Sequence, residues 1–159
     1  MTGIKRHIPP VLFVVFLLAL DQFSKYLAVV YLRPITEFQL IEGVFSLYYW
    51  ENAGMAFGML QGGRWIFVTV TIVVLGFILY YYVSLPKSRH QKLIRIFLLI
   101  LTGGALGNFI DRLLKGSVVD FFYFKLIDFP IFNLADVFLV VSIFALVIIT
   151  LFTKETKNE

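Results

Sequence analysis

Four long apolar runs alternate with shorter, more polar connections along the chain. The runs cover residues 11–32, 65–85, 93–114 and 134–152. Each is close to the roughly 20 residues that a helix needs to cross the hydrocarbon core of a bilayer. The pattern therefore predicts four membrane-spanning helices.

The first run follows Lys5 and Arg6, as a signal peptide would. It is too long and lacks a small-residue cleavage site, so we interpret it as a permanent helix with Pro9 and Pro10 near its start.

The two longer connections, 33–64 and 115–133, have different patterns. The first mixes short apolar alternations with glycines, which is typical of short strands and turns. Tyr48, Tyr49, Trp50 and Trp65 are residue types that favour the membrane–water boundary. A small β-rich platform on the outer leaflet is therefore expected. The second connection is too apolar for a free loop and too short to span, which predicts an interfacial segment.

Composition supports a membrane protein. The 159 residues are 60% hydrophobic, with a mean hydropathy of +0.88, whereas soluble domains are about 45–50% apolar. The fold class expected is an all-α membrane domain covering residues 1–159, with four transmembrane helices. There is no cysteine, which excludes a thiol nucleophile and a disulfide framework. The two histidines, His7 and His90, lie in basic flanks, which leaves little for a Ser-His-Asp or histidine-rich metal site.

The net charge of +4 is distributed unevenly. Eight lysines and arginines flank the runs at the two termini and the middle connection, against four in the two longer connections. This is the positive-inside pattern, so we expect cytoplasmic termini and extracytoplasmic 33–64 and 115–133. No basic stripe interleaved with stacking aromatics is present, which argues against nucleic acid.

Two aspartates stand where the chain meets the water-facing margin. Asp120 lies in the second outer connection, and Asp136 opens the last apolar run. Ionisable groups near hydrocarbon are functional candidates, and two carboxylates that meet can share one proton as acid and base. The alternatives are that Asp136 caps a helix and that Asp120 is an ordinary loop residue. Asn133, three residues before Asp136, could orient a carboxylate.

Asp21 and Lys25 are four residues apart in the first run and share a helix face. They form either a neutralised structural pair or an electrostatic support for a nearby site. Ser24 and Lys25 might suggest a serine–lysine protease, but adjacent residues point in different directions on a helix.

Two further groups of polar residues lie beside glycines in the sequence. Asn52, with Gly54 two residues later, forms either a plain turn or a polar contact to an extended substrate. In the third run, glycines between residues 103 and 107 favour close helix packing. Asn108 and Arg112 then share a face and predict a polar pocket, although Asp111 and Arg112 could instead be interfacial charges that reach water.

Taken in order, these residues resemble the lipoprotein signal peptidases, also called signal peptidase II. The resemblance covers nearly the whole chain through five blocks, none of them specific alone: Asp21-Gln22-Phe23-Ser24-Lys25, Asn52-Ala53-Gly54-Met55-Ala56-Phe57, Gly103 through Arg112, Val118-Val119-Asp120-Phe121 and Phe132-Asn133-Leu134-Ala135-Asp136.

The resemblance implies an aspartyl endopeptidase of the bacterial cytoplasmic (inner) membrane. Such an enzyme removes the signal peptide of prolipoproteins, just before the cysteine that carries diacylglyceryl. It implies a catalytic dyad, a β-cradle, a mobile interfacial element, globomycin-type inhibitors and no metal or other cofactor. We expect the chain to act as a monomer. By position, the dyad is Asp120 and Asp136, and the lining and supporting residues are Asn52, Gly54, Asn108, Arg112, Asn133, Asp21 and Lys25.

Three rival classes compete with this hypothesis. Asp21, Lys25, Asp111 and Arg112 could line the path of a small transporter or channel. The polar residues gather at one side of the membrane, however, whereas a path should continue across it. A metal-dependent lipid-modifying enzyme would need a dense aspartate signature on one helix, which is absent. A purely structural protein would not need two unpaired carboxylates at the surface.

Overall fold

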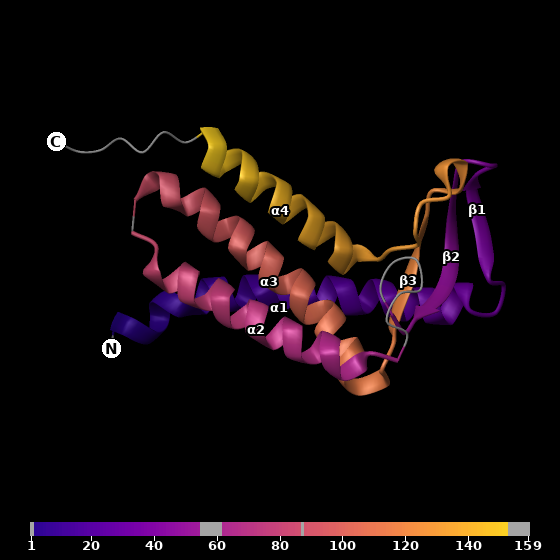
Figure 1. The fold of residues 1–159 in the computed structure, drawn as a ribbon, viewed down its shortest axis with the longest axis horizontal. Coiled ribbons are helices and arrows are strands. Elements are labelled where there is room, and N and C mark those ends of the chain that lie inside the picture. The colour runs from indigo at the N-terminus through magenta and orange to yellow at the C-terminus, as the bar shows by residue number, and fades with distance from the viewer. Residues whose placement is uncertain (1, 55–61, 87, 153–159) are drawn as a thin grey trace.

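Four long helices run side by side, and a small sheet stands beyond one end of them (Figure 1). The computed structural model describes residues 2–54, 62–86 and 88–152. The elements are α1 (Thr2–Leu27), the π-helical turn η1 (Ala28–Leu32), β1 (Glu37–Ile41), β2 (Phe45–Asn52), α2 (Arg64–Ser84), α3 (Arg89–Lys115), β3 (Val118–Tyr123), the 3₁₀ turn η3 (Lys125–Ile127) and α4 (Leu134–Phe152).

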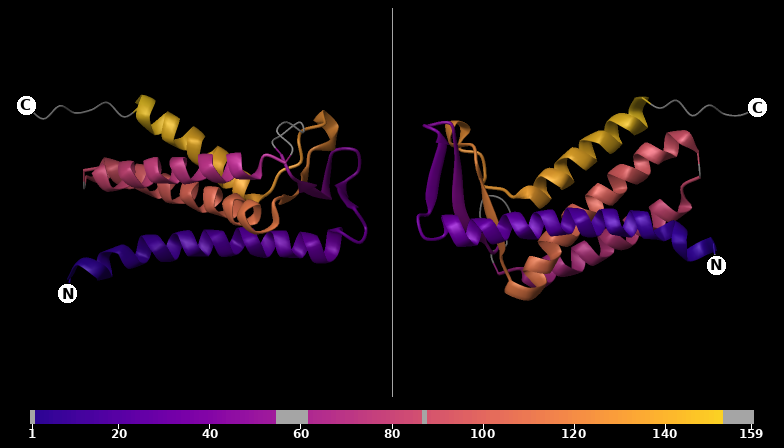
Figure 2. Two further views of the ribbon diagram at one scale, coloured as in Figure 1. Left: turned by 60° about the horizontal axis from the view of Figure 1, so that its bottom comes forward. Right: turned by 180° about the vertical axis from the view of Figure 1, so that it is seen from behind.

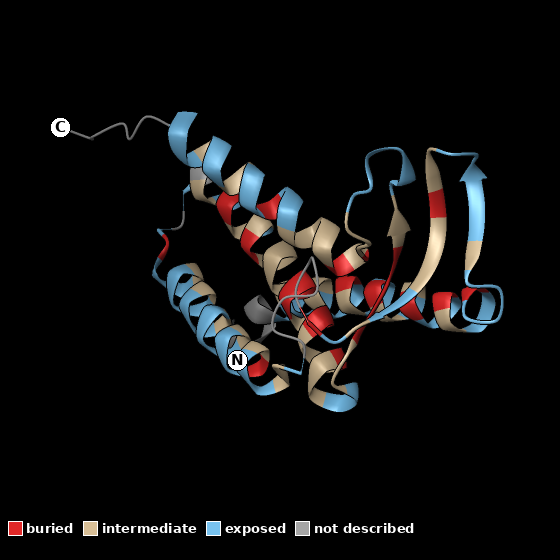
Figure 3. Ribbon diagram, turned by 45° about the vertical axis from the view of Figure 1, so that its right-hand side comes forward, coloured by how far each residue is buried: buried red, intermediate tan, exposed pale blue. Residues whose placement is uncertain are grey.

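The four predicted spans are confirmed. Within the described residues, four helical stretches are long and apolar enough to cross a membrane: Ile8–Leu32, Arg64–Ser84, Gln91–Lys115 and Leu134–Phe152. Only 6% of the α2 stretch is buried, against 33% of the α3 stretch. Exposed apolar faces along α2 and α4 (Figure 3) therefore have to meet lipid, because no other part of the described chain covers them.

Helix α3 is the centre of the bundle and contacts each of the other three helices (Figures 1 and 2). Its glycines allow this close approach. A Cβ on Gly103 would lie 2.9 Å from Leu17 Cβ of α1, and a Cβ on Gly104 would lie 2.6 Å from the carbonyl oxygen of Ala135 in α4. The predicted packing role of these glycines is thus confirmed.

Both prolines of the first helix lie inside it, because α1 begins at Thr2 rather than next to them. They still stand at the beginning of the apolar stretch Ile8–Leu32. Proline removes one backbone donor and crowds the preceding turn. Figure 2 shows α1 changing direction close to its N-terminal end.

The sheet has the antiparallel order β1-β2-β3. Strands β1 and β2 confirm the short strands predicted within 33–64. Strand β3 was not predicted: its residues were assigned to an interfacial segment, yet Val118 through Phe121 are buried. The local pattern could not show this, since the partner strand β2 is remote in sequence. Later in the same connection, Leu126 and Ile127 are exposed. The interfacial position of this part of the segment stays a prediction.

A glycine with a left-handed backbone conformation makes the turn from α3 into β3. Gly116 has a φ of +79° and its N–H donates to the Arg112 carbonyl oxygen at 3.1 Å, which ends the helix. The chain then enters β3 two residues later. This short turn fixes Asp120 close to the C-terminal end of α3.

We predict that Gly104→Val lowers the free energy of unfolding of the bundle by about 1–3 kcal/mol. The valine side chain would overlap backbone atoms of α4, which cannot move aside as a flexible side chain could. Thermal unfolding in detergent measures the effect. Gly76→Val in α2 is the matched control, since nothing lies within 4 Å of a Cβ at Gly76. Equal melting temperatures for the two variants would contradict this account of α3–α4 packing.

Candidate active site

One cavity of about 690 Å³ opens between the sheet and the adjoining ends of α3 and α4. Seven of the predicted site residues line it: Asn52, Gly54, Asn108, Arg112, Asp120, Asn133 and Asp136. The other two, Asp21 and Lys25, lie behind this wall and contact it through hydrogen bonds. The structure therefore brings residues from four chain segments to one place. Met55, Ala56 and Phe57 of the second sequence block lie outside the described residues.

Asp136 lies in the first turn of α4 and is held by a reciprocal cap. Its Oδ2 accepts from the Asn133 backbone N–H at 3.0 Å, while Asn133 Oδ1 accepts from the Asp136 backbone N–H at 3.1 Å. The capping alternative is therefore correct for Asp136, but it engages only one carboxylate oxygen. The other, Oδ1, accepts from Asn108 Nδ2 at 2.7 Å at the cavity wall.

Asp120 lies on β3 and is 3% exposed. Its Oδ1 accepts from Asn133 Nδ2 at 2.6 Å, and its Oδ2 accepts from Asn52 Nδ2 at 2.9 Å. Asn52 is itself oriented, since its Oδ1 accepts from the Gly54 backbone N–H at 2.9 Å. Asn52 thus makes the turn that its sequence suggests and also contacts the buried carboxylate.

Asn133 connects the two carboxylates. Its side-chain amide donates to Asp120, and its backbone N–H donates to Asp136. Both acids therefore contact a single residue, at the point where the chain enters α4. Two carboxylates held this closely, with amide donors on both, can share one proton across a cavity that admits water.

The environment of Asp120 raises its pKa from 3.8 to about 7. Burial is the largest cause, followed by the negative charge of Asp136. The amides of Asn52 and Asn133 and the charge of Lys25 act in the opposite direction but do not cancel it. At neutral pH the Asp120 carboxyl can therefore carry the shared proton.

Arg112 lies at the cavity wall with its guanidinium 4.8 Å from the Phe67 ring centroid. One of its nitrogens donates to the Gly54 carbonyl oxygen at 3.4 Å. The ring packing and this weak bond leave other donors of the guanidinium able to meet a carbonyl or carboxylate in the cavity.

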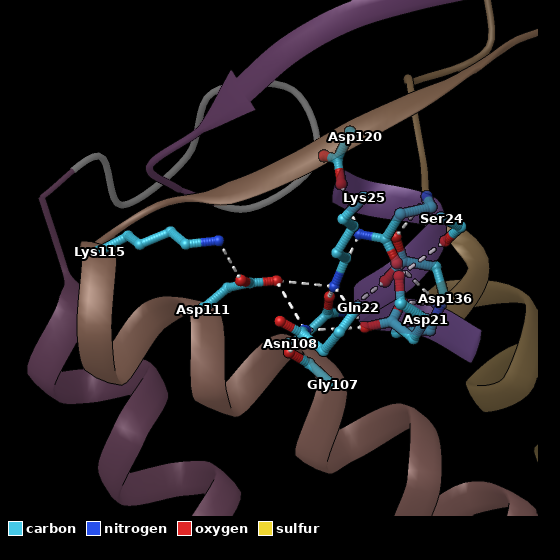
Figure 4. Close-up of polar contacts among 12 residues, drawn as sticks. Asp21, Gln22, Ser24, Lys25, Gly107, Asn108, Asp111, Lys115, Asp120 and Asp136 are labelled. Carbon is cyan, nitrogen blue, oxygen red and sulfur yellow. Dashed lines mark hydrogen bonds and ion pairs between the residues drawn. The ribbon is translucent and has the colours of Figure 1, made fainter. Parts of the chain in front are cut away.

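Behind the wall lies a cluster of charged side chains, of which Asp21, Lys25 and Asp111 are buried (Figure 4). Lys25 is 2% exposed, and its Nζ lies 2.9 Å from both Asp21 Oδ2 and Asp111 Oδ2. Lys115 Nζ lies 2.9 Å from Asp111 Oδ1. Two ammoniums thus balance two carboxylates. The alternative that Asp111 reaches water is wrong, since its side chain is fully buried.

Two members of this cluster were missed by the sequence analysis. Gln22 Nε2 donates to Asp21 Oδ2 at 3.1 Å and to Asp111 Oδ2 at 3.3 Å, which ties α1 to α3. Its place beside Asp21 in the first block was the available signal. Lys115 is four residues from Asp111, so the spacing rule that paired Asp21 with Lys25 could have found it.

The donor set gives no support for a resident metal ion. Among the residues that the structure describes, no three histidine, cysteine, aspartate or glutamate side chains lie close enough to hold one. The oxygens of Asp120 and Asp136 instead accept from amide N–H groups.

Comparisons with known proteins show which family the chain resembles. The family model described as signal peptidase (SPase) II matches residues 13–152. A lipoprotein signal peptidase of Brevibacillus brevis is 42% identical over 143 residues, which are 90% of this chain and 94% of the relative. One of Caldanaerobacter subterraneus is 47% identical over 133 residues, 83% and 88% of the two chains. A bacterial membrane enzyme solved at 2.3 Å resolution superposes with a TM-score of 0.83 at 32% identity, covering 95% of this chain and 92% of that one.

We predict that Asp120→Asn stabilises the protein, and more so at about pH 8 than at about pH 5. The raised pKa means that folding favours the protonated carboxyl. The contribution of Asp120 is therefore fully present below about pH 3.8 and is lost as the pH rises through about 7. Asparagine is neutral throughout, so the gap in melting temperature should widen by several degrees over this range.

The gap is the melting temperature of Asp120→Asn minus that of the unsubstituted protein at the same pH. A gap that stays constant over this range would show that burial does not raise the pKa of Asp120.

Proposed function

Because this chain belongs to the signal peptidase II family, a family of aspartic peptidases, we propose that Asp120 and Asp136 are its catalytic dyad. The protein is a multi-pass membrane endopeptidase that removes the signal peptide from prolipoproteins, just before the lipidated cysteine. The observation that carries the dyad assignment is the hydrogen bonding of both carboxylates to Asn133 at one cavity.

In the proposed mechanism the dyad holds one proton, with Asp120 protonated and Asp136 ionised. The raised pKa of Asp120 supports this distribution, as does the place of Asp136 at the positive end of α4. Asp136 takes a proton from a water molecule whose oxygen attacks the scissile carbonyl carbon. Asp120 donates its proton to the carbonyl oxygen, which stabilises the tetrahedral intermediate. The pair titrates as one unit during this cycle.

The second half of the reaction reverses the proton flow. The carbonyl forms again as the bond between carbon and nitrogen breaks, and the proton on Asp136 passes to the leaving amine of the cysteine. Asp120 takes back the proton of the hydroxyl group, so the dyad ends with the one proton with which it began. No metal or other cofactor is needed for either half.

The remaining polar lining is proposed to position the peptide. Asn52 fixes Asp120 and closes the end of β2, where an extended peptide could lie. Arg112 would bind a substrate carbonyl through donors that do not contact Gly54. Every one of these groups comes from a single copy of the chain, which supports activity as a monomer.

The apolar part of the cavity suits a lipid-modified substrate. It continues past the dyad along Val137, Val140 and Val141 of α4 and beneath Phe129 and Ile131. Val140 and Val141 are each 51% exposed on a helix that must face lipid. We propose that this track receives apolar parts of the prolipoprotein, and that globomycin-type peptides inhibit by occupying the same cavity.

The positive-inside pattern leads us to propose a bacterial cytoplasmic-membrane protein with both termini inside and the dyad at the extracytoplasmic face. We also propose that residues 1–159 form one peptidase domain. The transporter alternative loses support, because the buried charges gather next to the dyad at one end of the bundle.

The direct experiment uses purified protein with a diacylglyceryl-modified prolipoprotein and with its unmodified form. We expect cleavage of the modified form alone, before its cysteine, as seen by a gel shift and mass spectrometry. A chelator such as EDTA should leave the rate unchanged. Equal cleavage of both forms would contradict recognition of the lipid, and strong inhibition by EDTA would contradict a metal-free dyad.

For the dyad, we predict that Asp120→Asn and Asp136→Asn each lower the cleavage rate by at least about 10²-fold, since each removes an acid–base partner. Protein amount and melting temperature should show that both variants still insert and fold. Glu42→Gln, an exposed acid-to-amide change in the hairpin between β1 and β2, is the control with unchanged activity. Near-normal cleavage by either dyad variant would refute the assignment.

A further inference from the structure

The buried ammonium of Lys25 has three oxygen partners. Asp21 Oδ2 and Asp111 Oδ2 each lie 2.9 Å from Nζ, and Asn108 Oδ1 lies 3.0 Å from it. An ammonium has three N–H donors and no acceptor. Lys25 donates to Asp21 and Asn108 and forms an ion pair with Asp111. Two partners are charges that Lys25 neutralises, but the third is a neutral amide at the cavity wall.

That third contact fixes which way the Asn108 amide points. Asn108 Oδ1 accepts from Lys25 and also from Asn133 Nδ2 at 3.1 Å. Its Nδ2 is then the group that faces the cavity, where it donates to Asp136 Oδ1 at 2.7 Å. A flipped amide would set NH₂ against the ammonium and oxygen against the carboxylate, so both contacts would become repulsive.

We propose that Lys25 is a positioning residue for the dyad: through Asn108 it keeps an N–H donor directed at Asp136, which orients that carboxylate as the base. This inference rests on the proposed function. It gives the buried pair of Lys25 and Asp21 a task beyond neutralisation, since Asp111 already has a second cation in Lys115.

The charged groups around Asp136 come from three other elements. Asp120 faces it from β3 and carries the proton of the pair in the proposed resting state, so its own negative charge appears only when that proton leaves. Arg112 faces it from α3, where its positive charge and the Asp136 carboxylate attract each other. Lys25, from α1, stands behind Asn108. Removing Lys25 would withdraw the constraint on the amide and also a positive charge that lowers the pKa of Asp120. The pair titrates as one unit, so its acidic limb should move to higher pH.

The test compares Lys25→Met with Lys115→Met in cleavage of the diacylglyceryl-modified prolipoprotein across a range of pH. Both variants remove an ammonium from the same carboxylate, Asp111, but only Lys25 contacts Asn108. For Lys25→Met we expect kcat to fall about 10- to 100-fold, as for loss of a hydrogen bond to a charged group. We also expect the acidic limb of the pH profile to move to higher pH, with KM little changed. Lys115→Met should keep the kcat and the limb of the unsubstituted enzyme.

A double-mutant cycle separates positioning from structural support. If Lys25 acts through Asn108, then Lys25→Met should cost less than about 2-fold in kcat when Asn108 is already alanine. Additive losses, or a Lys25→Met limb that does not move, would overturn the proposal.

Lys25→Met leaves two buried carboxylates with one cation, so it could fail to fold. Lys25→Met with Asp21→Asn leaves Asp111 paired with Lys115, and it serves as the second variant. A folded double variant with normal kcat and an unmoved limb would overturn the proposal, whereas a lowered kcat with a moved limb supports it. Failure of the unsubstituted protein to cleave would instead contradict the proposed function, which keeps the two failures distinct.

Discussion

Charges at the edge of a hydrocarbon phase must be paired with opposite charges. The buried cluster around Lys25 meets this constraint, because its ammonium pairs with both Asp21 and Asp111. Asp21 does more than neutralise Lys25: its Oδ1 accepts from the backbone N–H of Ala135 at 2.9 Å. That N–H belongs to the first turn of α4, where backbone donors have no partner within the helix. A carboxylate of α1 therefore caps α4. Gly107 has to lack a Cβ because the same carboxylate occupies that space.

The site depends on this cluster through a sequence of contacts. Lys25 orients Asn108, which contacts Asp136 and Asn133, and Asn133 reaches Asp120 on the sheet. Lys25 and Asn133 both donate to Asn108 Oδ1, so the Asn108 amide has only one orientation, with its Nδ2 directed at Asp136. A polar network that is satisfied throughout is rigid in a low-dielectric setting, and that rigidity is what a catalytic pair requires.

The sequence predicts the parts of this structure that are local. The four spans follow from continuous apolar runs, and capping of α4 by Asp136 was one of the alternatives that the sequence left open. Strand β3 does not follow, since Asp120 pairs across the sheet with Trp50, which is remote in the chain. The position of the two aspartates at the hydrocarbon edge made them a candidate pair, and the resemblance of the motif blocks implied their catalytic role. Gln22 shows the same limit, as its bond to Asp111 crosses between helices.

The two acids differ because they lie on different kinds of element. Asp136 is at a helix N-terminus, which favours its charge, whereas Asp120 is buried in a strand, which opposes ionisation. In the proposed mechanism, this difference in surroundings lets two identical side chains serve as acid and base. Because the cap that starts α4 and the bond that holds Asp120 both come from Asn133, the separation of the dyad cannot change without fraying the helix. Catalytic geometry and helix stability are thus set by the same hydrogen bonds.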